Sequence, residues 1–405
     1  MPDKKDKYAA GEQGLGYIYQ PRFALLRLLQ LPEDTSVFIE KDDDLDFIDQ
    51  HGSKTLASLK HKADGDKLTN LSTDFWKSVN IWLDRYNRDG GPESNLNFFL
   101  FSTGTVVETS FLRYFLSGYL LRADDPSLSS LANDALSSST STLISPIAKK
   151  FDLLDGEKKE DFLSRIQIFD NSPRITDIPN TIKEQYMRTI RREFRESVFN
   201  RLEGWWNDVV IDLLSGKRLD AIQGHEVSEK LSLFADEYKT DNLPITFQGA
   251  MPHYDIETET DSRQFVVQLR EIGVTSSRIR NAILDYYRAF EQRSAWAREN
   301  LLSLGEMEKY EDRLVDEWTR YKDMIFEELD EKSTNAVVTS AGKKLYDWAD
   351  LSSGNLSSLR IRERVSEPYV VRGGFHILAN ARLSPRIYWH PHFLNRLSSI
   401  LGVAK

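Results

Sequence analysis

The 405-residue chain is acidic, with a formal net charge of −10, and 40% of its residues are apolar. This composition provides enough apolar side chains for folded cores and excludes a chain that is disordered throughout. The charge argues against nucleic-acid binding over the whole surface, but it is compatible with a local basic groove or with a metal ion that offsets carboxylates.

The chain contains no cysteine, which excludes disulfides, thiolate metal sites and a cysteine nucleophile. The N-terminal segment MPDKKDKYAAGEQG is charged and lacks the apolar stretch of a signal peptide. No apolar run approaches the roughly 18 residues that a membrane-spanning helix needs. We therefore expect a cytoplasmic protein that makes no membrane contact.

The first 105 residues predict a small α/β domain. Two segments carry apolar side chains at helical spacing, and three short segments between them carry alternating or clustered apolar side chains. A final segment is an apolar run. The predicted elements are a helix at 17–30, strands at 36–40, 44–49 and 55–60, a helix at 72–86 and a strand at 96–102. This order predicts a three-stranded meander followed by a right-handed crossover to a parallel fourth strand.

Residues 106–330 have a different texture and predict a helical domain. The clearest helical patterns lie at 111–122, 183–216 and 276–300, and the Pro- and Gly-containing segment 243–258 is typical of an irregular connection. Residues 331–405 predict a small α+β C-terminal module, because residues from 354 onward look like short strands and turns.

Five carboxylates stand close together from the end of the first predicted strand into the second, and a lysine ends the third strand. The carboxylates are Glu40, Asp42, Asp43, Asp44 and Asp46. Because like charges repel, the segment is either a solvated turn or a site for something positive. A hairpin brings Asp44 and Lys60 to the same end of the sheet. A carboxylate there can hold Mg²⁺, and a neighbouring lysine can orient an attacking water or stabilise the charge of phosphodiester hydrolysis.

The sequence at this point resembles the PD-(D/E)xK nuclease core, and more closely the double-stranded DNA endonuclease domain of CBASS and related bacterial anti-phage systems. The matching segments are GYIYQ (16–20), EKDDDLDF (40–47), LASLKHK (56–62), DFWKSVNIWL (74–83) and FFLFSTG (98–104). The resemblance implies a restriction-endonuclease-like fold, with helix, three strands, helix and strand, and hydrolysis of duplex DNA with Mg²⁺ or Mn²⁺.

The resemblance also implies roles for single residues. Asp44 is the principal metal ligand, Lys60 is the catalytic lysine, Gln20 lines the site from the first helix, and Glu40 precedes the aspartates as in the family. Asp43 and Asp46 are the alternatives to Asp44, if the register differs by one or two residues.

One position departs from the family pattern. The residue two before the lysine is usually Gln, Glu or Asp in this superfamily, but it is Ser58 here. A serine hydroxyl is a poorer ligand for a hard cation than a carboxylate. The second protein ligand to the metal is therefore expected from Glu40, Asp46 or the backbone carbonyl of Leu59.

The C-terminal segment RGGFHILANARLSPRIYWHPHF (372–393) is similar to the C-terminal module of ABC-three-component defence proteins. Together with the nuclease-like segments it resembles the nuclease subunit of Lamassu systems. This resemblance implies partnership with an SMC-like ATPase and a small third subunit, which hold the nuclease inactive until foreign DNA is sensed, and self-association on activation. The chain lacks the G-x-x-x-x-G-K-S/T motif and is not expected to hydrolyse ATP itself, so any ATPase that the system needs must be a partner.

Three further patterns favour structural roles or leave two interpretations open. His376, His390 and His392 lack recognisable zinc spacing, and His376 and His390 are expected to be hydrogen-bonded structural residues of the C-terminal module. Trp205 and Trp206 are expected in a core. The arginines at 188, 191, 192 and 195 predict a basic stripe on one helix, which either tracks phosphates or forms a solvated face.

The sequence therefore predicts a metal-dependent double-stranded DNA endonuclease in an anti-phage complex. One alternative is a catalytically degenerate adaptor that scaffolds the ATPase complex, a possibility to which Ser58 points. A second alternative is a nuclease that acts on RNA or on single strands.

Overall fold

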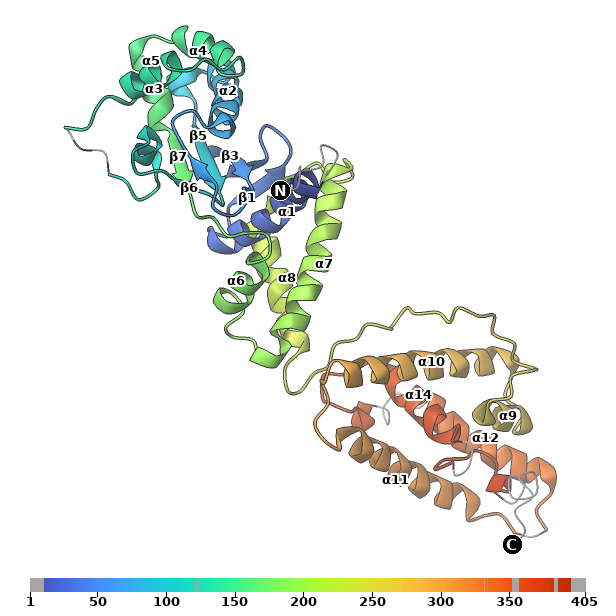
Figure 1. Cartoon of the computed structure of the whole chain (residues 1–405). Coiled ribbons are helices and arrows are strands. Elements are labelled where there is room, and N and C mark those ends of the chain that lie inside the picture. Colours follow the sequence, from blue (N-terminus) through green and yellow to red (C-terminus); the bar gives the residue numbers. More distant parts are fainter. Residues whose placement is uncertain are drawn as a thin grey trace, which may run out of the picture. The chain divides into compact units, whose positions relative to one another are not determined.

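The structure is a computed structural model, and it consists of two compact units, Met1–Phe234 and Ala235–Lys405 (Figure 1). The residues that it describes are 11–120, 122, 124–330, 332–351, 357–381 and 385–394. The boundary predicted at residue 105 falls within the first unit, and the one predicted at residue 330 falls within the second. None of the helices in this described part combines the length and apolar character that crossing a bilayer requires.

The first unit begins with the predicted order of helix, three strands, helix and strand, and this α/β fold is confirmed. The elements are α1 (Gly11–Gln30), β1 (Ser36–Ile39), β2 (Leu45–Ile48), β3 (Lys54–Lys60), α2 (Thr73–Arg88) and β5 (Leu96–Ser102). Strands β1, β2 and β3 form an antiparallel meander, and β5 lies parallel to β3. The crossover through α2 is what allows the parallel pair to form.

Two strands from the segment predicted to be helical extend this sheet to six strands. Strand β7 (Ile166–Phe169) pairs in parallel with β5, and β8 (Ile222–Gln223) pairs antiparallel with β1. The sheet order is β7-β5-β3-β2-β1-β8. Both strands are short, and apolar runs of this length cannot be told from helical segments by periodicity. A separate small ladder joins β4 (Lys67–Leu68) to β6 (Thr105–Val106).

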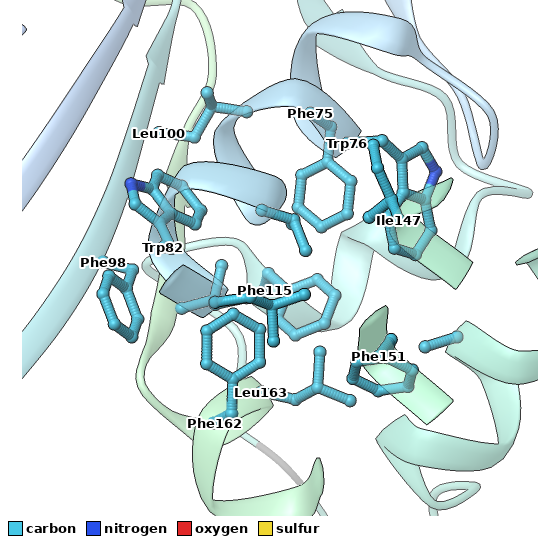
Figure 2. Close-up of a cluster of buried hydrophobic side chains, with 14 of the residues drawn as sticks. Phe75, Trp76, Trp82, Phe98, Leu100, Phe115, Ile147, Phe151, Phe162 and Leu163 are labelled. Atoms are coloured by element: carbon cyan, nitrogen blue, oxygen red, sulfur yellow. The ribbon is translucent and has the colours of Figure 1, made fainter. Parts of the chain in front are cut away.

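One face of α2 packs into the main apolar core of the first unit (Figure 2). Trp82 is fully buried and stacks on Phe98 of β5, with ring centroids 5.5 Å apart. Three short helices close the other side of this core. They are α3 (Leu128–Ser137), α4 (Ser145–Asp152) and α5 (Gly156–Ser164). The spacing of Phe75, Val79 and Trp82 places them on one helical face, which explains why α2 forms as predicted.

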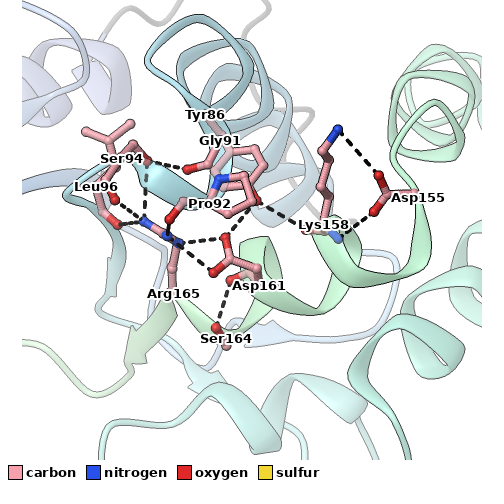
Figure 3. Close-up of polar contacts among 10 residues, drawn as sticks. All are labelled: Tyr86, Gly91, Pro92, Ser94, Leu96, Asp155, Lys158, Asp161, Ser164 and Arg165. Carbon is pink, nitrogen blue, oxygen red and sulfur yellow. Dashed lines mark hydrogen bonds and ion pairs between the residues drawn. The ribbon is translucent and has the colours of Figure 1, made fainter.

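A polar network fastens α5 to the chain that leads into β5 (Figure 3). Arg165 donates to the backbone carbonyls of Pro92, Ser94 and Leu96 at 2.7, 2.6 and 3.1 Å. Its Nε also contacts Asp161 Oδ2 at 2.9 Å, an oxygen that accepts from the Tyr86 hydroxyl as well. Because Arg165 directly precedes β7, this network sets where β7 meets β5.

The helical predictions after residue 105 are only partly correct. The segment predicted as one helix at 183–216 forms α6 (Ile178–Gln185), a 3-10 turn (Arg192–Phe194) and α7 (Arg195–Leu214). The basic stripe predicted at 188–195 therefore does not lie on one helix. Arg195 satisfies the broken backbone by donating to the carbonyls of Arg188 and Ile190.

Other details of the first unit also depart from the helical prediction. Among the described residues of the segment 111–122, helical structure is limited to a 3-10 turn at Phe111–Phe115. Helix α8 (Gly224–Glu237) follows β8. Trp206 is buried, as predicted, and its Nε1 donates to the carbonyl of Pro21 at 2.8 Å, whereas Trp205 is half-exposed.

The second unit is mostly helical. Its helices are α9 (Gln264–Glu271), α10 (Ser276–Arg298), α11 (Glu306–Phe326), α12 (Asn335–Leu351) and α14 (Pro368–Ala379), with a 3-10 turn at Ser357–Leu359. Segment 243–258 is irregular, as predicted. The prediction of short strands after residue 354 is wrong for α14, and no strand forms among the described residues there. The two central glycines of α14 look like helix breakers, but Gly373 allows close packing against α10, and Gly374 allows it against α10 and α11.

Candidate active site in the N-terminal unit

Asp44 ends the tight loop between β1 and β2 and meets side chains and backbone from two other elements. The loop is closed by a hydrogen bond from the Glu40 N–H to the Asp44 carbonyl, and Glu40 adopts a left-handed backbone conformation with a φ of 54°. Asp44 Oδ1 accepts from Gln20 Nε2 of α1 at 3.0 Å. Asp44 Oδ2 accepts from the backbone N–H of Leu59 on β3 at 2.6 Å.

Lys60, the last residue of β3, completes this cluster. Its Nζ lies 3.9 Å from Asp44 Oδ2, and both side chains are about one-quarter exposed, at 23% each. The β2–β3 register pairs Leu45 with Ala57, so the residues just beyond this pair, including Asp44 and Lys60, meet at one end of the sheet. The structure thus brings Gln20, Asp44 and Lys60 together from three separate elements.

Asp43 lies beside this cluster and is held by two hydrogen bonds. Its Oδ1 accepts from the backbone N–H of Asp44 at 2.9 Å, and its Oδ2 accepts from Trp82 Nε1 at 2.6 Å. Burial, reinforced by the charge of Asp44, raises the pKa of Asp43 to about 6, against the opposing effect of the Trp82 hydrogen bond.

Asp46 belongs to a different group of contacts. Its side chain is 0% exposed and accepts from the backbone N–H groups of Asp42 and Asp43 at 3.2 and 3.1 Å. Lys54 Nζ lies 3.0 Å from Asp46 Oδ2 and also pairs with Asp42, which Arg85 contacts at 2.8 Å. Burial raises the pKa of Asp46, and the Lys54 ammonium opposes that shift. Through these contacts Asp46 stabilises the loop between β1 and β2.

The remaining predicted ligands lie around Asp44 in different ways. The side chain of Glu40 is exposed. Ser58 is buried, its Oγ lies 3.4 Å from Asp44 Oδ2, and it accepts from the Ser78 hydroxyl of α2 at 2.8 Å. Leu59 contacts Asp44 through its N–H, whereas the predicted ligand was its carbonyl.

The oxygen atoms near Asp44 fit one class of metal site. No group of three His, Asp or Glu side chains in the described part of the chain is arranged to hold an ion by itself. Mg²⁺, however, is commonly held by one or two carboxylates and completes its shell with waters and substrate phosphates. A single carboxylate at Asp44, with the amide of Gln20 and the hydroxyl of Ser58 beside it, is a donor set of that kind.

The contact of Trp82 with the loop of Asp44 has no signal in the sequence. The spacing of Trp82 on α2 correctly marks it as a core residue, and nothing in the pattern shows that the indole N–H reaches the loop of Asp44. The same holds for Ser78, whose hydroxyl reaches Ser58 from α2. Both contacts depend on the crossing of α2 over the sheet, which only the folded chain provides.

Of the histidines at 376, 390 and 392, His376 and His390 are buried, whereas His392 is exposed. His376 of α14 is 2% exposed, and its ring stacks on Phe265 of α9 with centroids 5.0 Å apart. Burial lowers the pKa of His376 to about 3, which keeps the imidazole neutral. His390 Nδ1 lies 3.1 Å from the backbone N–H of His392, which donates to it.

Residues 265–397 match the family model of C-terminal domain 7 of the ABC-three component (ABC-3C) systems. This domain identifies the chain as a component of an ABC-3C system. The resemblance predicted from the segment 372–393 is thereby confirmed for the C-terminal part, and the matched region begins earlier, at the start of α9. No curated protein and no solved structure matches the chain.

The ABC-3C match implies that other components of such a system are partners of this chain. The matched residues exclude the whole cluster around Asp44, which lies in the first unit. The family match therefore assigns no role to that cluster.

Proposed function

We propose that this ABC-3C component is the nuclease effector of a bacterial defence complex, a Mg²⁺- or Mn²⁺-dependent endonuclease that cuts double-stranded DNA. The observation that carries the proposal is the convergence of Asp44, Lys60 and Gln20 at one end of the sheet, with Lys60 Nζ 3.9 Å from the Asp44 carboxylate. A carboxylate, a cation and an amide in this arrangement suit metal-assisted attack on a phosphodiester.

In this mechanism Asp44 would hold the metal ion, with Gln20, Ser58 or the Leu59 carbonyl as neutral oxygen donors. Such an ion would polarise the phosphodiester and make a water molecule more acidic. Lys60 places a positive charge where negative charge develops on the phosphate, and such preorganised charge is usually the largest single contribution to catalysis. The hydrogen bonds that Asp44 accepts from Gln20 and Leu59 aim its carboxylate toward Lys60.

The acidic net charge suits regulation by assembly. A chain with a formal charge of −10 has a weak general attraction for DNA and gains from partners that build a binding surface. We propose an SMC-like ATPase and a small third subunit as these partners, bound through the C-terminal unit, with self-association on activation. Under this proposal the free chain is inactive, and a constitutively active monomer in gel filtration would contradict it.

The test is cleavage of plasmid and linear duplex DNA with Mg²⁺ or Mn²⁺, with and without the partner subunits, and with chelator as a blank. Asp44→Asn and Lys60→Ala are each expected to lower cleavage at least 100-fold, because they remove the metal ligand and the cation. Asp212→Asn and Lys217→Ala are matched controls from an exposed ion pair at the end of α7, 3.3 Å apart. Both controls are expected to retain full cleavage.

The outcomes separate the alternatives. Cleavage restricted to RNA or single-stranded DNA, and still dependent on Asp44, would replace the duplex substrate. Absence of cleavage under every condition, together with unchanged protection of cells by Lys60→Ala, would support the degenerate adaptor. The buried hydroxyl of Ser58 in place of a carboxylate is the feature that favours that adaptor.

A further inference from the structure

A chain of two hydrogen bonds connects the apolar core to the backbone of Asp44. Trp82 Nε1 donates to Asp43 Oδ2 at 2.6 Å, and the Asp44 N–H donates to Asp43 Oδ1 at 2.9 Å. Both carboxylate oxygens of Asp43 are thus used, one toward the core and one toward the loop.

The core end of this pair of hydrogen bonds is tightly packed. The indole of Trp82 is 0% exposed and stacks on Phe98 at an interplanar angle of 22°, with Leu100 nearby in the same cluster (Figure 2). A ring packed this closely has one available orientation, so its N–H points in a constant direction. The loop end, in contrast, is a tight turn in which Glu40 occupies a left-handed conformation.

We propose that Trp82 and Asp43 are positioning residues for Asp44, transmitting the rigid geometry of the core to the metal-binding carboxylate. The inference rests on the proposed function. Ligands are oriented by partners in the next shell, and loss of such a partner typically costs about 10- to 100-fold in metal affinity or activity.

Trp82→Phe removes the donor and keeps an aromatic ring against Phe98. A control for loss of an indole hydrogen bond exists on the same helix. Trp76 is equally buried, and its Nε1 donates to the Asn70 carbonyl at 2.8 Å, in the same core as Trp82. Trp76→Phe therefore removes the same kind of bond without touching the loop of Asp44.

Asp43→Asn provides a second test. An asparagine has one acceptor oxygen, so an amide that still accepts from the Asp44 N–H turns its NH₂ group against the Trp82 N–H. Combining Asp43→Asn with Trp82→Phe removes this conflict between two donors. The double variant is therefore expected to lose no more than Trp82→Phe alone, and such non-additivity is a sign of direct coupling.

The experiment measures Mn²⁺ binding to the full chain without DNA, from the electron paramagnetic resonance signal of free Mn²⁺. It also measures kcat and KM for duplex cleavage in the active assembly. Trp82→Phe is expected to weaken Mn²⁺ binding and to lower kcat by about 10-fold each, with KM for DNA unchanged. Trp76→Phe is expected to match the wild type in both, while its melting temperature falls about as much as that of Trp82→Phe.

Equal Mn²⁺ affinity and kcat in Trp82→Phe and Trp76→Phe would overturn the inference and leave the proposed function standing, provided that Asp44→Asn abolishes binding and cleavage. A wild type that neither binds Mn²⁺ nor cleaves any nucleic acid would overturn both.

Discussion

Gly373 of α14 lies directly against the backbone of Asp285 on α10. A β-carbon at residue 373 would be 2.2 Å from the Asp285 carbonyl oxygen and 2.4 Å from the β-carbon of Ala289. Backbone atoms of a packed helix cannot move aside, so only glycine permits the distance between these two helices. The contact gives a physical reason for a glycine at this point of the ABC-3C domain.

Gly373→Ala is expected to destabilise the second unit by about 2–3 kcal/mol, the usual range for overpacking in a core. Gly204→Ala is the control, because Gly204 lies within α7, is exposed, and has no atom within 4 Å of an added β-carbon. That substitution is expected to stabilise the first unit by up to about 1 kcal/mol. Calorimetric unfolding of both variants measures the difference, and an unchanged melting temperature for Gly373→Ala would refute the close packing of α10 and α14.

His376 makes the stability of the second unit depend on pH. Burial lowers its pKa to about 3 in the folded chain, so below the ordinary value near 6.5 the unfolded chain binds a proton that the folded chain excludes. The stability that depends on the neutral imidazole of His376 is fully present above about pH 6.5 and is lost as the pH falls toward 3. At pH 5 the expected loss relative to pH 7 is about 2 kcal/mol.

The measurement is urea unfolding at pH 7 and pH 5 for the wild type and for His376→Gln. The variant has no imidazole to titrate, so its stability is expected to fall less between the two pH values by about 2 kcal/mol. An identical pH dependence in both proteins would show that His376 takes up its proton in the folded state.

Lys54 forms an ion pair with the carboxylate of Asp46, which has no exposure to solvent. Lys54→Met leaves the Asp46 side chain, which is 0% exposed, with only backbone donors, and a buried charge without its partner typically costs about 3–5 kcal/mol. Lys150→Met is the control, since its partner Asp84 is 63% exposed and such pairs contribute about 0–1 kcal/mol. Adding Asp46→Asn to Lys54→Met is expected to restore part of the lost stability, and equal unfolding free energies for the two lysine variants would disprove the role of Lys54.

Arg165 uses the planar geometry of its guanidinium to bind three carbonyls at once (Figure 3). Lysine keeps the charge but cannot reach the same set of acceptors, so Arg165→Lys is expected to cost about 2–3 kcal/mol. Arg188→Lys, at an exposed arginine with a hydrogen bond to the Glu184 carbonyl, is expected to change stability by less than about 0.5 kcal/mol. Thermal unfolding monitored by circular dichroism compares the two, and similar melting temperatures would argue against the network.

Much of the N-terminal fold follows from local sequence patterns. Alternation and helical spacing determine α1, β1, β2, β3, α2 and β5. The pairing of Leu45 with Ala57 then brings Asp44 and Lys60 to one end of the sheet, as the hairpin predicted. The segment at 372–393 likewise indicates the ABC-3C domain from its sequence alone.

Only the tertiary structure separates residues with similar patterns. Asp44 and Asp46 are two residues apart and chemically identical. Gln20 and Lys60 lie next to Asp44, whereas Lys54 and backbone donors enclose Asp46. Strands β7 and β8 are too short to carry a periodic signal, and the helix predicted at 183–216 is interrupted. Periodicity reports which side of an element is apolar, whereas the partners that an element meets depend on contacts between residues far apart in the chain.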